Sequence, residues 1–168
     1  ASSHLYNFVY DDFCAQYLEM SKVALNSGNE VKKNATYQTL YLVLKDIILL
    51  IYPYTPFVTE EMYLSLPAHK ESIMDESYPE YDRSLLNKKA VEKLSILEGM
   101  IKDIRNYKST GGMAPNAKVK LVLSPAEPFK GYGDYLKRFT FASSYEIKKD
   151  KLGGSSFLYP GFEMMVEE

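Results

Sequence analysis

The stretch "PYTPFVTEEMYLSLP", residues 53–67, decides how the first part of this chain folds. It follows the apolar run "LVLKDIILLIY", residues 42–52, and contains two prolines three residues apart. Pro53 ends the preceding helix, because proline has no N–H to donate and its ring clashes with the preceding turn. Pro56 suits the first position of a new helix. The stretch therefore predicts a tight reversal between two antiparallel helices.

The start of the second helix carries further signals. Thr55 directly precedes Pro56, and a threonine in that position can cap a helix N-terminus with its hydroxyl oxygen. Glu60 and Glu61 fall in the early turns, where negative charge complements the helix dipole. We therefore expect a helix that is capped at Thr55 and begins at Pro56.

Apolar residues recur at helical spacing in the segments on either side of this corner. Residues 1–25 carry two neighbouring apolar stripes, and such a broad apolar face is typical of an inner helix of a bundle. The stripes are Leu5, Val9, Phe13, Tyr17, Met20 and Ala24 on one side and Tyr6, Tyr10, Cys14 and Leu18 on the other. The helix that ends at Pro53 is predicted from Leu40, Leu44, Ile47, Ile48 and Ile51.

A third long helix is expected from about Leu85 to Lys108. Its predicted buried seam is Val91, Leu94, Leu97, Ile101 and Ile104. On a neighbouring surface, cations follow at intervals of three residues, at Lys102, Arg105 and Lys108. Basic residues there also suit the negative end of the helix dipole, so these charges have a structural interpretation as well.

The composition changes after residues 109–112, "STGG". Alternation in "AKVKLVLSP" predicts a strand, "GDYLKRFTFA" suits a short helix, and "SYEIKK" and "SFLYP" suit further short strands. The predicted fold class is therefore mainly α. An antiparallel helical bundle over residues 1–110 is followed by a small α+β subdomain over residues 111–168.

The composition also limits the function classes. A single cysteine, Cys14, excludes an internal disulfide framework, and His4 and His69 form no cluster with metal-ligand spacing. The single cysteine suits a reducing compartment, so we expect a cytoplasmic protein. The purely apolar run of residues 47–52 is too short to span a membrane, so we expect no membrane partner. The formal net charge of −2 means that any RNA binding must rest on a local patch.

Catalytic motifs are absent from the sequence. It has no nucleophile elbow, Walker loop or HExxH motif. The glycines at 131, 133, 153 and 154 suit turns, because neither pair follows a strand with a complete phosphate-binding fingerprint. We expect this chain alone to hold no metal or cofactor and to catalyse nothing.

Four segments resemble the valyl-tRNA synthetase family. "YNFVYDDFCAQYLEMSK" is similar to the family's aromatic signature, and "YPYTPFVTEEMY" to its Pro-x-x-Pro-Phe-x-Thr-Glu-Glu corner. "SIMDESYPEYD" and "IRNYKSTGGMAPNAKVKL" resemble its Ser-Ile-Met segment and its Ile-Arg-Asn helix end with the following Pro-x-x-Lys loop. Tyr10, Ala15 and Gln16 depart from the first signature. The proline corner is shared with leucyl and isoleucyl relatives, whereas the other segments favour the valyl enzyme.

The resemblance implies a helical anticodon-binding domain of the class I synthetase type, truncated at its N-terminus, and then a small α+β piece. The family's ligase attaches valine to its tRNA with ATP. Its His-Ile-Gly-His and Lys-Met-Ser-Lys-Ser signatures are missing here, so the resemblance implies an inactive part whose partners are valine-specific tRNA and the rest of the synthetase chain.

The RNA-facing candidates are Lys102, Arg105, Asn106, Lys118 and Lys120. Cations would contact phosphates, and an amide would contact a base edge. Two alternatives stay open: the equivalent domain of a leucyl or isoleucyl enzyme, and a helical protein-interaction module without RNA affinity. If the preceding bundle helix is missing, the apolar face between Leu5 and Phe13 loses its cover, and we expect the chain to self-associate.

Overall fold

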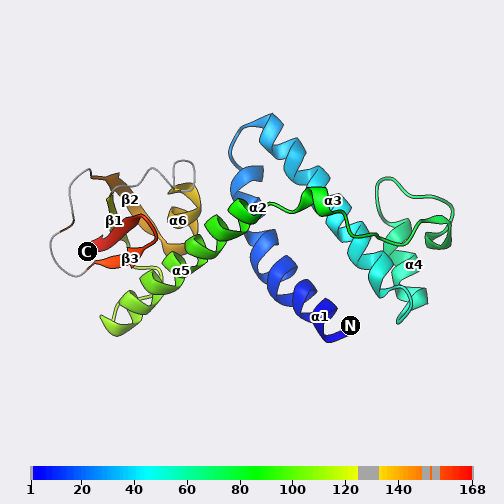
Figure 1. Ribbon diagram of the computed structural model, residues 1–168, viewed down its shortest axis with the longest axis horizontal. Helices are drawn as coiled ribbons and strands as arrows, with labels where there is room; N and C mark the ends of the chain where they lie inside the picture. The colour runs from blue at the N-terminus through cyan, green and yellow to red at the C-terminus, as the bar shows by residue number, and fades with distance from the viewer. Residues whose placement is uncertain (1, 125–132, 149–151, 153–155, 168) are drawn as a thin grey trace. The chain divides into compact units, whose positions relative to one another are not determined.

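The computed structural model describes residues 2–124, 133–148, 152 and 156–167. It divides into two compact units, Ala1–Ser84 and Leu85–Glu168, which are coloured blue to green and green to red in Figure 1. The predicted fold class is confirmed, because helices dominate and a small sheet follows them. The sequence boundary at residue 110 marks the change from helices to strands. The compact units divide earlier, because the last long helix packs with the α+β part.

The first unit is helical throughout its regular parts. Its elements are α1 (Ser2–Asn7), the π-helical segment η1 (Phe8–Tyr17), α2 (Leu18–Leu25), α3 (Glu30–Ile51), α4 (Pro56–Leu64) and the short 3-10 turns η2 (Ile73–Asp75) and η3 (Arg83–Leu85). Asn29 caps α3, since its side-chain oxygen accepts a hydrogen bond from the Lys32 N–H at 3.0 Å. Among the helices of the described residues, none is long and apolar enough to cross a membrane.

The predicted reversal at the two prolines is confirmed. The α3 helix ends at Ile51, and the Tyr54 N–H closes the turn by donating to the Ile51 carbonyl at 2.8 Å. Pro56 stands in the first turn of α4, which folds back on α3 (Figure 1). A buried cluster joins the two helices to the segment that follows them: Ile48, Leu49, Tyr63, Leu66 and Ile73.

Two details of this corner differ from the prediction. Thr55 occupies the cap position, but its side chain makes no capping hydrogen bond; instead its carbonyl accepts from the Thr59 hydroxyl at 2.8 Å. The first turn of α4 contains no acidic residue. Glu60 lies beyond that turn and accepts from the Ile73 N–H at 3.3 Å, so its carboxylate holds the segment after α4.

The N-terminal helix is less buried than its two stripes predict. Only Phe13 and Ser21 are buried between Ser2 and Leu25, and Tyr6 and Tyr10 stack on each other in solvent, with ring centroids 4.4 Å apart. The π-helical turn of η1 changes the angular spacing of side chains, so stripes counted at the α-helical period do not stay on one face.

The second unit combines two helices with a four-stranded sheet. Its elements are α5 (Lys88–Thr110), β1 (Val119–Ser124), α6 (Gly133–Thr140), β2 (Ala142–Ile147), β3 (Phe157–Tyr159) and β4 (Phe162–Glu167). The strand order is β2-β1-β4-β3, with β1 parallel to β2 and the other two pairs antiparallel. The parallel pair needs a crossover, and α6 lies on that connection.

The α5 helix packs on this unit through its second half. Leu97, Met100, Ile101 and Ile104 are buried, but Val91 and Leu94, predicted in the same seam, are exposed. The Tyr159 hydroxyl of β3 donates to Asp103 of α5 at 2.5 Å, and burial raises the pKa of this phenol. The covered part of α5 is therefore the part that carries the candidate RNA-binding residues.

The predicted strands and the short helix are confirmed, and the structure adds β4, which sequence reasoning missed. Phe162, Met164 and Val166 face inward and alternate with less buried residues. The β3–β4 connection is a tight turn with Gly161 at φ +88°, in the region that a type II turn requires of its third residue.

Candidate nucleic-acid interface

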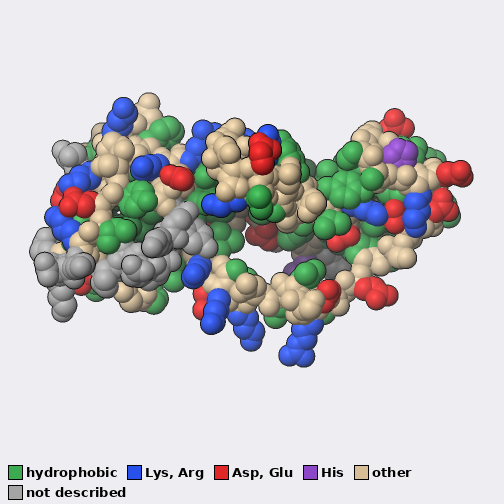
Figure 2. Space-filling view, turned by 90° about the horizontal axis from the view of Figure 1, so that it is seen from above, with side chains coloured by type: hydrophobic (Ala, Val, Ile, Leu, Met, Phe, Trp, Pro, Cys, Tyr) green, Lys and Arg blue, Asp and Glu red, His purple; other side chains and the backbone are tan. Residues whose placement is uncertain are grey.

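The charges of the chain are divided unevenly between the two units. Residues 1–84 contain six Lys and Arg against twelve Asp and Glu, whereas residues 85–168 contain fourteen against ten. The small overall negative charge therefore conceals an acidic first unit and a basic second unit. Lys and Arg side chains stand beside apolar ones on the α6 and sheet side, at the left of Figure 2. All five candidate RNA-binding residues lie in the basic unit.

Three of the candidates lie on the second half of α5. Lys102, Arg105 and Asn106 are all exposed. The Arg105 guanidinium donates to the Phe139 carbonyl, in the last turn of α6, at 3.4 Å. This contact joins the exposed charge of α5 to the C-terminal end of α6.

Lys108, which the spacing placed on the same surface as Lys102 and Arg105, is buried instead, with 2% of its surface exposed. Its ammonium donates to the Ala117 and Thr140 carbonyls, each at 2.5 Å, and more weakly to Pro115 at 3.4 Å. Burial lowers the pKa of this lysine. Lys108 therefore ties the end of α5 to the entrance of β1 and to the end of α6.

The remaining two candidates differ in their surroundings. Lys118 is exposed and directly follows Ala117, one of the carbonyl partners of Lys108. Lys120 lies in β1 between carboxylates of both neighbouring strands, Glu146 at 2.9 Å and Glu167 at 3.3 Å, and the two carboxylates raise its pKa. Among the described residues no carboxylate pairs with Lys118, so its charge is open to a phosphate, while the charge of Lys120 is offset by Glu146 and Glu167.

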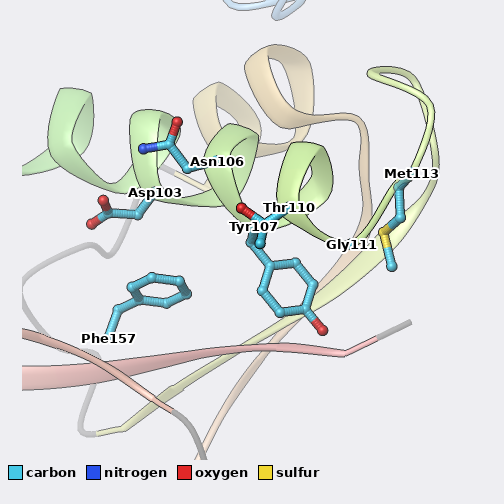
Figure 3. A pocket seen from close by; sticks show the side chains of 7 residues that line it. All are labelled: Asp103, Asn106, Tyr107, Thr110, Gly111, Met113 and Phe157. Atoms are coloured by element: carbon cyan, nitrogen blue, oxygen red, sulfur yellow. The ribbon is translucent and has the colours of Figure 1, made fainter.

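Asn106 lines an open groove of about 490 Å³ at the end of α5. Figure 3 shows the Tyr107 and Phe157 rings between the helix and the strands, with the Asn106 amide directed away from Phe157. Asp103, also in the groove lining, is held by its hydrogen bond from Tyr159. The groove therefore has aromatic walls and a rim of amide, hydroxyl and carboxylate groups.

Sequence reasoning missed the contribution of α6 and the residue after it. Lys137 and Arg138 are exposed, and the Lys137 ammonium lies 5.1 Å from the centroid of the Tyr145 ring. Phe141 follows α6 with half of its surface exposed. The segment "GDYLKRFTFA" shows these basic and aromatic residues, but only the fold brings the end of α6 to Arg105 and the Phe141 ring to Lys108.

Gly133 is explained by packing and not by a phosphate loop. Gly133 opens α6, where a phosphate loop would need an uncovered backbone, but a Cβ atom there would lie 2.1 Å from the Tyr145 ring. The glycine thus serves the packing of that ring, and Gly131, 153 and 154 lie outside the described residues. The same residues contain no group of three His, Cys, Asp or Glu that could hold a metal.

A separate charged cluster stabilises the first unit. The Glu76 carboxylate accepts from the Lys45 ammonium at 2.8 Å and from the buried Tyr63 hydroxyl at 2.6 Å, and Lys70 lies 3.5 Å away. The hydrogen bonds from Lys45 and Tyr63 lower the pKa of Glu76 from 4.5 to about 2. This carboxylate joins α3, α4 and the segment after α4.

Comparison with known proteins assigns the chain to a family. Residues 1–123 match the family model described as the anticodon-binding domain of tRNA ligase. The chain belongs to this family. The match includes both α5 and the start of the sheet, and so extends across both compact units. All five candidate residues lie inside the matched range.

Several curated relatives are valine–tRNA ligases, which confirms the resemblance seen in the four segments. That of Lactobacillus johnsonii is 42% identical over 108 residues, 64% of this chain and 12% of the relative. That of Lactobacillus acidophilus is 31% identical over 175 residues, 99% of this chain and 20% of the relative. That of Oceanobacillus iheyensis is 33% identical over 153 residues, 88% of this chain and 17% of the relative. The chain spans a fifth or less of the length of these relatives.

Proposed function

We propose that this chain binds the anticodon arm of a valine-specific tRNA as part of a valine–tRNA ligase. The observation that carries the proposal is the basic second unit, whose exposed cations on α5 and before β1 lie within the range matched by the anticodon-binding family. An excess of cations on one unit attracts the phosphate backbone even though the whole chain is slightly acidic.

The exposed residues divide by the kind of contact that they would make. Lys102, Arg105 and Lys118 would contact phosphates, which position the RNA without selecting its sequence. Asn106, with a donor and an acceptor on one amide, would contact a base edge. Lys120 would contribute less, because Glu146 and Glu167 already offset its charge.

The wider activity belongs to this proposal as well. In a whole ligase, ATP-dependent activation of valine would take place in parts other than this chain, which would be inactive alone and would act in the cytoplasm with the rest of the synthetase.

A tRNA titration at two salt concentrations tests the proposal. Each phosphate contact adds roughly 0.7 to 0.9 to the logarithmic salt slope, so wild-type binding should weaken steeply as salt rises. The double variant Arg105→Glu and Lys118→Glu should bind cognate and non-cognate tRNA more weakly and with a smaller slope. The matched control reverses one exposed lysine and one exposed arginine of the acidic unit, Lys32→Glu and Arg83→Glu. A titration curve that neither pair changes would mean that α5 and the entrance of β1 do not face RNA.

A further inference from the structure

Phe141 has an unusual position at the end of α6. Its backbone has φ +55°, the one positive value among the non-glycine residues that the structure describes. Glycine is favoured at a left-handed position directly after a helix, because any side chain there is strained. Phe141 nevertheless places a phenyl ring at this point, and 52% of its surface is exposed. About half of this side chain therefore lies outside the core, at a backbone position where any side chain is strained.

A buried lysine contacts the Phe141 ring. The buried Lys108 ammonium lies 5.8 Å from the centroid of the Phe141 ring, within the range of a cation–π contact. The same ammonium donates to the Thr140 carbonyl, directly before Phe141. One side of the ring therefore has a fixed partner, and the exposed surface is presented to solvent in a defined orientation.

Three exposed cations lie on segments that meet the backbone near Phe141. The Arg105 guanidinium reaches the Phe139 carbonyl, two residues before Phe141. Both chain neighbours of Lys118 are connected to residues that flank Phe141. On one side, the carbonyls of Ala117 and Thr140 accept from the same Lys108 ammonium. On the other side, Val119 pairs with Ala142 in the sheet. Arg138 is exposed in the last turn of α6. Three separate segments thus bring exposed positive charges to the same corner as the exposed ring.

We propose that Phe141 is a stacking platform for one unpaired base of the bound RNA, with Arg105 and Lys118 on the flanking phosphates. Unpaired bases stack on aromatic side chains without regard to sequence, and the neighbouring cations follow the backbone. The positive charge of this unit favours a polyanion over an apolar peptide as the occupant. The inference rests on the proposed function and assigns a specific contact to it.

The test compares two RNAs that differ in unpaired bases alone. A stem-loop RNA with a fluorescent adenine analogue in its loop is titrated against a blunt duplex RNA with the same number of phosphates. One stacked base corresponds to roughly 5- to 150-fold in affinity. Phe141→Leu should therefore weaken stem-loop binding about tenfold and abolish the change in fluorescence. Duplex binding should stay unchanged, because its bases are not free to stack.

Two further variants separate stacking from folding. Phe141→Gly suits the backbone at φ +55°, so it should keep the melting temperature and still lose stem-loop affinity. Phe141→Trp keeps an aromatic surface and should retain the affinity. The matched control is Phe57→Leu, which alters a phenylalanine that is 90% exposed in the acidic unit.

The outcomes of these titrations test the Phe141 platform separately from the proposed tRNA-binding function. If wild type binds the stem-loop and both Phe141→Leu and Phe141→Gly bind it equally well, the platform is wrong and the tRNA-binding function stands. If wild type binds neither RNA at low salt, the proposed function fails and the platform fails with it. Equal losses for Phe57→Leu and Phe141→Leu would also overturn the platform, because the effect would not depend on the cationic corner.

Discussion

Replacing Glu76 by glutamine should destabilise the first unit in a pH-dependent way. The Glu76 side chain is only 11% exposed and is bound by Lys45 and Tyr63. Glutamine keeps the size of the side chain but removes its charge. The half-buried Lys45 ammonium then loses its carboxylate partner. An unpaired buried charge strongly destabilises the folded state.

The magnitude follows from the lowered pKa of Glu76, from 4.5 to about 2. Each pKa unit corresponds to about 1.4 kcal/mol, so the ionised form contributes at most ~3.5 kcal/mol to the free energy of unfolding. Because folding lowers this pKa, the contribution is fully present above about pH 4.5. It is lost as the pH falls from 4.5 towards 2. Wild type and Glu76→Gln should therefore differ by about 3.5 kcal/mol at pH 7 and converge near pH 2.

The assay is native-state amide exchange and urea unfolding across this pH range, read at Leu49 in the buried cluster of the first unit. A local probe is needed because the two compact units need not unfold together. Glu80→Gln, an exposed change in the same connecting segment, is the matched control and should have no effect. An equal loss of stability at every pH would refute the argument, since the difference would then come from shape and not from charge.

Three further predictions follow from the described contacts and the sequence. Lys108→Met should lower stability by about 2 to 3 kcal/mol in chemical unfolding, because buried carbonyls lose their donor, whereas exposed Lys102→Met should not. Light scattering should show self-association at high protein concentration through the exposed Tyr6 and Tyr10 rings, and Tyr6→Lys with Tyr10→Lys should suppress it; a strict monomer with a protected first helix would contradict this. Pyrophosphate exchange with valine should not exceed background, and any exchange above it would show a catalytic site in this chain.

The helical part of the fold could be predicted because its signals are local. Two prolines define the corner, and the helical period correctly predicts that Ile47 and Ile48 of α3 are buried. It includes Ile51, which is only half-buried, and omits the buried Leu49. The stripes of residues 1–25 predicted more burial than the structure shows, because they were counted at the α-helical period. The segment η1 is π-helical and has a different period. The strand β4 was missed because Met165 breaks the contrast between its inward and outward residues, and only pairing with β1 and β3 reveals it.

The candidate site was predictable in its residue types and less so in its geometry. The spacing of Lys102, Arg105 and Lys108 indicates one surface, but burial depends on what packs on the helix. Lys108 faces carbonyls from segments far along the chain, and no local pattern shows that. Phe141 has no signal of its own, because neither its backbone conformation nor its cationic neighbours can be inferred from adjacent residues.

Hydroxyl-radical footprinting of a valine tRNA bound to this chain tests the central claim most directly. If the chain holds the anticodon arm, the backbone of the anticodon stem and loop should be protected in wild type, and that protection should fade in the Arg105→Glu and Lys118→Glu variant. Protection confined to the acceptor end, or a bound complex with no protection in the anticodon arm, would contradict the account.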